Sequence, residues 1–270
     1  MTIKNMIRIV PLVLAGALPA FLLLLLIAAG ISLIRRPPRR LYNRRVAETD
    51  FCPLDRIPQR FVNMIILSED ETFREHKGIY PEAIRRAIRI NLRYGEIITS
   101  GSTITQQLVK NLYLNFDRNI CRKLVEMILA IVIEWFLTKD EILELYLNVI
   151  YYGCGRYGIT AASSYYFGKK PEALTLNQMF MLMCILSAPT GNNPLRCPEN
   201  YIICRGHRIN YWLNGRKEGL TQEEAKIISS YPVEVIDPEL RKATDERERY
   251  AAVPMRNERF GPPHQMISET

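Results

Sequence analysis

The chain has 270 residues, of which 48% are apolar, and a net charge of +8. This length accommodates one sizeable domain with appendages. Six of the positive charges are arginines between residues 35 and 45, and no nucleic-acid motif is present, so no nucleic-acid partner is expected. The histidines do not cluster and no C-x-x-C pair occurs, which argues against a zinc site.

An apolar run without a charged residue occupies residues 9–34. As a helix it would be about 39 Å long, enough to cross a bilayer with some tilt. A cleaved signal peptide is the alternative, but the run is too long and no small-x-small site precedes the arginines. We therefore expect a cytoplasmic segment 1–8, a single-pass transmembrane anchor 9–34 and a basic juxtamembrane linker 35–46.

The rest of the chain predicts a mainly α fold, because no alternating apolar run of useful length occurs. Capping signals at Thr103, Thr138, Thr175 and Thr221 mark helix starts, each with Gln or Glu three residues later. The expected helical stretches are residues 57–70, 81–93, 103–110, 119–137, 138–148, 157–167, 175–186, 205–220 and 221 onward.

Two of these stretches carry specific expectations about burial. In residues 81–93 the apolar positions Ala83, Ile84, Ala87, Ile88 and Leu92 are expected to face inward, with the arginines solvated. Residues 127–136 are almost wholly apolar, which favours a buried spine over a membrane-facing surface.

The stretch 101–126 is the most informative part of the chain. Thr103, Gln106, Gln107 and Lys110 recur at helical spacing near a helix start, where backbone N–H groups favour an anionic ligand. Farther on, Arg122 and Glu126 are four residues apart, with Lys123 beside them. Taken separately, these patterns are better explained by a solvated polar face and an ordinary ion pair than by a binding site.

Four ordered motifs together resemble the peptidoglycan glycosyltransferase family, the glycan-polymerising module of class A penicillin-binding proteins and of monofunctional transglycosylases. The matching pieces are Glu69-Asp70-x-x-Phe73-x-x-His76-x-Gly78, Gly101-Ser102-Thr103-x-Thr105-Gln106-Gln107-x-x-Lys110, Arg122-Lys123-x-x-Glu126 and Lys139-x-x-Ile142-Leu143-x-x-Tyr146-Leu147-Asn148. Two positions depart from the family pattern: Tyr80 stands where an Asp is usual, and Ser100 where a Gly is common.

The resemblance implies a lysozyme-like, two-lobed glycosyltransferase domain over residues 47–232. The polar composition of residues 233–270 predicts a disordered tail after it. It implies that lipid II is polymerised into β-1,4 glycan strands by inverting transfer, with release of lipid diphosphate. Glu69 is expected to be the base and Glu126 the second carboxylate, holding a divalent cation, magnesium, against the diphosphate. Expected substrate-binding residues are Asp70, Phe73, His76, Ser102, Thr103, Gln106, Gln107, Lys110, Arg122, Lys123 and Asn148.

Topology is where two arguments disagree. The arginines after the apolar run outnumber Lys4 and Arg8 before it, so the positive-inside rule alone would leave the domain in the cytoplasm. The resemblance implies an extracytoplasmic domain, because the lipid-linked substrate lies in the outer leaflet, and long domains translocate largely regardless of charge. We therefore expect a cell-membrane protein whose arginine cluster contacts headgroups or the diphosphate.

The resemblance also names partners and alternatives. The expected partners are lipid II, the growing glycan, the membrane, and transpeptidases or division and elongation proteins. Without a Ser-x-x-Lys transpeptidase motif, the chain is expected to be monofunctional. A lysozyme-like glycan-cleaving enzyme and an inactive membrane scaffold remain the two alternatives.

The six cysteines permit disulfides in an extracytoplasmic domain. Cys197 and Cys204 are the nearest pair in sequence, whereas Cys184 lies in an apolar run and is expected to be a buried free thiol. The connectivity stays open at this stage.

Overall fold

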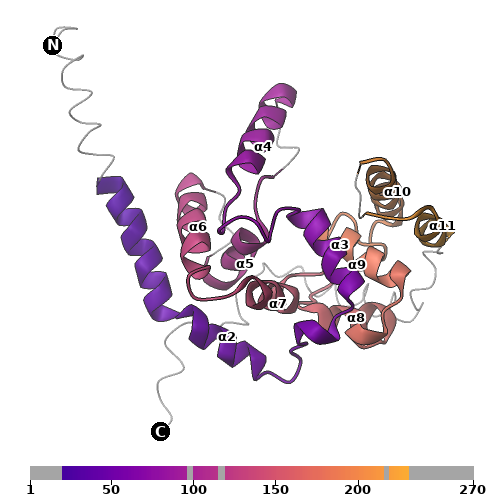
Figure 1. The fold of residues 1–270 in the computed structure, drawn as a ribbon, viewed down its shortest axis with the longest axis horizontal. Helices are drawn as coiled ribbons and strands as arrows, with labels where there is room; N and C mark the ends of the chain where they lie inside the picture. Colours follow the sequence, from indigo (N-terminus) through magenta and orange to yellow (C-terminus); the bar gives the residue numbers. More distant parts are fainter. Residues whose placement is uncertain (1–19, 96–99, 115–118, 216–218, 231–270) are drawn as a thin grey trace.

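The computed structural model describes residues 20–95, 100–114, 119–215 and 219–230, and over these ranges it is mainly α-helical (Figure 1). No strand occurs in these ranges, only isolated bridges, which confirms the expected fold class. The helices are α2 (Pro38–Val46), α3 (Gln59–Glu69), α4 (Pro81–Tyr94), α5 (Ile104–Tyr113), α6 (Ile120–Ile133), α7 (Lys139–Val149), α8 (Ile159–Phe167), α9 (Leu176–Ser187), α10 (Pro198–Gly215) and α11 (Gln222–Ser230), with 3-10 turns η1 (Leu54–Arg56) and η2 (Pro171–Ala173).

The N-terminal helical stretch Ala20–Val46 is long and apolar enough to cross a membrane. Residues 1–19, and with them the expected cytoplasmic segment and residues 9–19 of the expected anchor, lie outside the described ranges, as does the tail 233–270. The segment expected as a linker is mostly helix α2, which packs on α7. Arg36 donates to the carbonyl of Leu112 (2.5 Å), and Arg39 pairs with Glu141. The domain itself therefore binds part of the arginine cluster.

The helix starts follow the predicted capping signals. Thr103, Thr138 and Thr175 each begin a helix with a capping box, in which side chain and backbone satisfy each other three residues apart. Thr221 makes the same pair of hydrogen bonds with Glu224. These signals are local, so the sequence alone suffices to place them.

Two groups of helices make up the domain. Helix α5 packs against α6 and α7, and α3 packs against α9, which also contacts α10 and α11. The groups join through a shared core in which the middle of α9 is fully buried, from Phe180 to Ile185. In Figure 1 the first group lies nearer the N-terminal helix and the second on the opposite side.

Helix α4 corrects one expectation about burial. Ala87 is buried, but Ile88 and Leu92, predicted to face inward, are 54% and 78% exposed. The reason is that α4 projects from the body of the domain (Figure 1). At its base the backbone of Gly101 approaches so closely that a Cβ there would lie 2.7 Å from the carbonyl oxygen of Ala83. The periodicity identified an apolar stripe, but not whether the body would cover it.

Helix α6 confirms the buried spine and corrects its length. Leu129, Ala130 and Ile133 are buried, as the spine interpretation requires, and Ile131 and Val132 between them are half-buried. The helix ends at Ile133 rather than near residue 137, and the chain turns outward at Trp135 and Phe136, which are 76% and 49% exposed.

All six cysteines are free thiols in the structure. Cys184 is fully buried, as expected. Cys184 is hydrogen-bonded to Cys204 of α10, and this hydrogen bond lowers the pKa of the Cys204 thiol to about 6. The amide of Asn192 also donates to the Cys204 sulfur, at 3.3 Å. Cys197 is the nearest cysteine to Cys204 in the sequence, but in the fold the neighbour of Cys204 is Cys184.

Candidate active site

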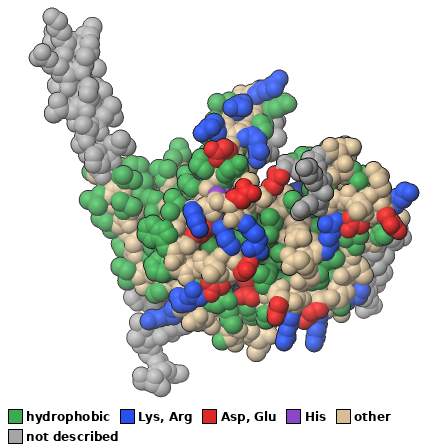
Figure 2. Space-filling model, viewed as in Figure 1, with side chains coloured by type: hydrophobic (Ala, Val, Ile, Leu, Met, Phe, Trp, Pro, Cys, Tyr) green, Lys and Arg blue, Asp and Glu red, His purple; other side chains and the backbone are tan. Residues whose placement is uncertain are grey.

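A hollow of about 380 Å³ opens where the end of α3, the start of α4, the loop before α5 and helix α10 meet. Figure 2 shows acidic and basic side chains together on the face below α4. The hollow is lined mainly by polar and aromatic side chains, which include Glu69, Asp70, Tyr80, Arg86, Ser102, Thr103, Arg208 and Tyr211. The first and second sequence motifs therefore meet at one hollow.

Glu69 is the last residue of α3, and the fold fixes its carboxylate from two sides. The amide of Gln107 donates to Oε2 at 3.1 Å, and the hydroxyl of Ser68 donates to Oε1 at 3.2 Å. The Tyr146 hydroxyl donates to Oε1 of Gln107 at 3.0 Å, which turns the amide N–H₂ toward Glu69. Burial, and next the charge of Glu69, raise the pKa of Tyr146 well above its usual value, so it remains a donor.

Asp70 ties the first motif to the start of α5. Its Oδ2 accepts from the backbone N–H of Ile104 and lies 2.9 Å from Nε2 of His76. Nδ1 of His76 is buried and makes no hydrogen bond within the described structure. The His76 ring stacks on Tyr80, with centroids 6.1 Å apart and planes within 15°. The aromatic that replaces the usual Asp thus supports the histidine and lines the hollow.

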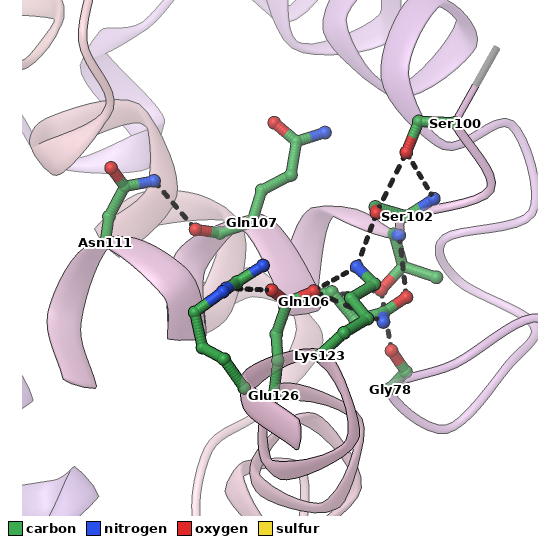
Figure 3. Close-up of polar contacts among 10 residues, drawn as sticks. Gly78, Ser100, Ser102, Gln106, Gln107, Asn111, Lys123 and Glu126 are labelled. Carbon is green, nitrogen blue, oxygen red and sulfur yellow. Dashed lines mark hydrogen bonds and ion pairs between the residues drawn. The ribbon is translucent and has the colours of Figure 1, made fainter. Parts of the chain in front are cut away.

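Glu126 forms the centre of a second group of polar side chains on α6 (Figure 3). Its side chain is only 2% exposed. Arg122 pairs with Oε2 at 2.8 Å, and Lys123 pairs with Oε1, which also accepts from Gln106 at 3.4 Å. Lys123 donates further to the Ser102 hydroxyl at 2.7 Å. Both carboxylate oxygens are therefore engaged by the protein's own donors, and the group reaches the hollow through Ser102.

The polar residues of α5 were expected to share one face of the helix, but two of them contact two different carboxylates. Gln106, fully buried, contacts Glu126, whereas its neighbour Gln107 contacts Glu69. Thr103 caps the helix and donates to the carbonyl of Gly78 at 2.6 Å. Lys110 lies partly buried in the last turn of α5.

Three of the residues expected to bind substrate are held by contacts within the protein, outside the lining of the hollow. Phe73 is fully buried, with the Lys139 ammonium 4.5 Å from its ring centroid. Asn148 is 5% exposed and exchanges hydrogen bonds of 2.8 Å with the backbone of Cys52. His76, held against Asp70, does not line the hollow either. The geometry gives these three residues a supporting role in place of substrate contact.

Sequence reasoning missed three residues at the hollow. Arg208 and Tyr211 come from α10, outside every motif, and Arg86 comes from the arginine face of α4 that was expected to be solvated. Arg208 donates to the Ser68 hydroxyl at 2.5 Å, beside Glu69. No local signal marks Arg208, because its contact spans 140 residues of sequence.

The surroundings of Glu126 do not fit a divalent cation. Magnesium takes oxygen ligands in octahedral geometry, usually from carboxylates and water. Here both carboxylate oxygens accept from cationic or amide donors, and the described residues hold no group of three metal-ligating side chains. Glu126 is therefore placed to hold the cationic side chains of the protein and not a metal ion.

A helical domain of lysozyme-like kind, with a positioned carboxylate at the wall of a hollow and cations around a second carboxylate, fits an enzyme that transfers or cleaves glycosyl groups. A family model described as transglycosylase matches residues 38–214, more than half of the chain. The chain therefore belongs to the transglycosylase family, and the resemblance drawn from the four motifs is confirmed.

Three relatives illustrate the similarity. A protein named as a transglycosylase in Cupriavidus necator is 39% identical over 184 residues, covering 66% of this chain and 79% of the relative. Penicillin-binding protein 1A of Escherichia coli is 49% identical over 172 residues, covering 63% of this chain and 20% of the relative. Penicillin-binding protein 1B of Haemophilus influenzae is 35% identical over 213 residues, covering 72% of this chain and 27% of the relative. The chain thus spans about a fifth to a quarter of these penicillin-binding proteins.

Proposed function

We propose that this protein is a peptidoglycan glycosyltransferase that polymerises lipid II into β-1,4 glycan strands by inverting transfer. One observation carries the proposal: Glu69 stands at the wall of the hollow with its carboxylate oriented by Gln107, in a member of the transglycosylase family. The relatives named as penicillin-binding proteins and as a transglycosylase support it.

In the reaction, a sugar 4-hydroxyl attacks the anomeric carbon that carries the lipid diphosphate. The new C–O bond forms as the bond to the diphosphate breaks, and Glu69 accepts the proton of the hydroxyl. Because Gln107 and Ser68 already fix both carboxylate oxygens, little reorientation is needed when the hydroxyl arrives.

The leaving diphosphate carries away negative charge, which requires cations nearby. Arg122 and Lys123 surround Glu126, and Lys123 also contacts Ser102 at the hollow. We assign diphosphate stabilisation to these two side chains and to Lys110, with Glu126 holding the first two in place.

A magnesium requirement is tested by adding a chelator to the polymerisation reaction, with strand formation as the readout.

The experiment that tests the function is incubation of the detergent-solubilised full chain with labelled lipid II, and separately with preformed glycan strands. We expect lipid II to be converted into long strands while preformed strands keep their length. Shortening of preformed strands would instead identify a lysozyme-like hydrolase, and no change in either substrate would identify an inactive scaffold.

A further expectation concerns topology. The substrate requires that the domain beyond residue 47 lies outside the cytoplasm, despite the arginines after the span. Cysteines introduced at exposed positions such as Glu75 and Lys170 should react with a membrane-impermeant maleimide in intact cells. Labelling of these sites only after lysis would place the domain in the cytoplasm and contradict the expectation.

We also expect Arg208 to position Glu69. Its guanidinium contacts Ser68, which in turn contacts the Glu69 carboxylate, so Arg208→Gln should lower kcat/KM about tenfold, equivalent to about 1.4 kcal/mol in the barrier. Arg205 is the matched control, because it lies one turn earlier on α10 but contacts the ring of Tyr201 instead. Equal effects of Arg208→Gln and Arg205→Gln would contradict this role.

A further inference from the structure

The turn between α6 and α7 presents two large aromatic side chains to the outside. Trp135 and Phe136, which we call the aromatic corner, are 76% and 49% exposed. The turn is fixed, because its backbone N–H groups donate back to Val132 and Ile133, and the following Leu137 is buried. The corner therefore holds its aromatic rings outward at a small entropic cost on binding.

Cationic side chains surround a hollow of about 330 Å³ beside the aromatic corner. Arg39, Lys77 and Lys139 line it, with Glu134 as the carboxylate among the lining residues. Glu134 is already paired with Lys139 at 2.7 Å, and Arg39 is paired with Glu141. Lys77 is exposed and adds further positive charge. The excess of positive charge favours an anionic group at this hollow.

The position of the aromatic corner is set by the membrane-spanning helix. The apolar run ends at Ile34, and Arg39, only five residues later, donates to the carbonyl of Phe136 at 2.9 Å. Five residues extend over at most about 18 Å, and the side chain of Arg39 alone bridges the remaining distance to Phe136, so the corner lies near the end of the apolar run. Leu25 and Ala29 are buried in the domain core, so the span packs on the domain, and Figure 2 shows hydrophobic side chains gathered on the same side.

We propose that the aromatic corner and its cationic hollow form a second membrane contact, seated in the headgroup region of an anionic bilayer. Indole rings favour this region because one end of the ring is apolar and the other can hydrogen-bond. Lysine and arginine beside an anionic surface add electrostatic attraction. Together with the span, the corner fixes the height and tilt of the domain relative to the bilayer.

The composition of the chain provides a direct probe. The sequence has two tryptophans, and Trp212 is 1% exposed in the core, so Trp212→Phe leaves Trp135 as the sole indole. The full-length variant is reconstituted, one chain per nanodisc, in phosphatidylglycerol or phosphatidylcholine, each with and without bromine on the acyl chains. If the Trp212→Phe variant does not fold, the difference spectrum between the wild type and Trp135→Phe reports the same residue.

In phosphatidylglycerol we expect Trp135 to emit at shorter wavelength than in detergent, to lose most of its emission to brominated lipid, and to be shielded from acrylamide. In phosphatidylcholine all three effects should be smaller. Lys77→Gln should reduce the bromine quenching, whereas Lys170→Gln, which makes the same charge change outside the hollow, should not.

Emission that is insensitive to brominated lipid would overturn the proposal, whether or not acrylamide reaches the indole. Shielding from acrylamide that appears only with two chains per disc would show that a second copy covers the corner, which also overturns it. Since no activity is measured, the outcome does not depend on the proposed transferase function.

Discussion

Glu69→Gln is expected to abolish glycan polymerisation while lipid II still binds. The substitution preserves the shape of the side chain and removes only the proton acceptor. A positioned general base typically contributes about 10²–10⁴ in rate. We therefore expect a loss of at least this order in kcat, measured with labelled lipid II, and a dissociation constant for lipid II close to that of the unmodified protein.

The structure explains why no neighbour should replace Glu69. His76 is the nearest alternative base in the sequence, but its Nε2 faces Asp70 and its Nδ1 is buried away from the hollow. Asp70 itself is 8% exposed and accepts from the backbone of Ile104. Both groups are thus committed to holding the start of α5.

Glu75→Gln is the matched control, because Glu75 is an exposed carboxylate of the same motif that does not line the hollow. It should leave polymerisation unchanged. Robust polymerisation by Glu69→Gln would remove the assignment of the base. A parallel loss of lipid II binding would instead show that the carboxylate binds the substrate.

The sequence predicted those parts of the fold that depend on neighbouring residues. The capping boxes at Thr103, Thr138 and Thr175 need only residues three positions apart, and each is present. Periodicity likewise found the apolar stripe of α4. It could not show that Leu92 would be exposed, because burial depends on what packs against a helix and not on the helix itself.

The candidate site was predictable where motifs supplied its residues, and not where the fold brought distant segments together. Glu69, Ser102 and Thr103 line the hollow as the motifs indicated. Arg208 reaches it through a contact between α10 and α3, for which no spacing in the sequence gives a signal. Phe73 lies within a motif yet is buried. A motif shows which residues a site requires, but not which of them contact the substrate and which hold the contacting residues in place.

Glu126→Gln is expected to lower both activity and stability. The buried carboxylate separates two cations, Arg122 and Lys123, and the neutral amide would leave them facing each other. Removing one member of a buried ion pair costs about 3–5 kcal/mol. Lys123 is 38% exposed and Arg122 15%, so water offsets part of this loss. We expect destabilisation of about 1–3 kcal/mol, a decrease in Tm of about 2–4 °C for each kcal/mol.

The effect on activity follows from the same contacts. Without Glu126 the two cations move apart, Lys123 loses its fixed approach to Ser102, and the leaving diphosphate is less well stabilised. Because both carboxylate oxygens are engaged by protein donors, we expect the same fractional loss at every magnesium concentration. A loss that magnesium restores would show that Glu126 holds the cation after all and that the hydrogen bonds seen here rearrange with substrate.

Two further variants separate the structural effect from the catalytic one. Glu224 on α11 is the ion-pair partner of Arg60 on α3 and lies far along the chain from the motifs. Glu224→Gln removes this ion pair and should lower Tm without a change in polymerisation. The double variant Arg122→Gln with Glu126→Gln should recover part of the lost stability, because one of the facing cations is gone. It should not recover activity, since Arg122 is assigned to the diphosphate. Recovery of both together would mean that Glu126 serves folding alone.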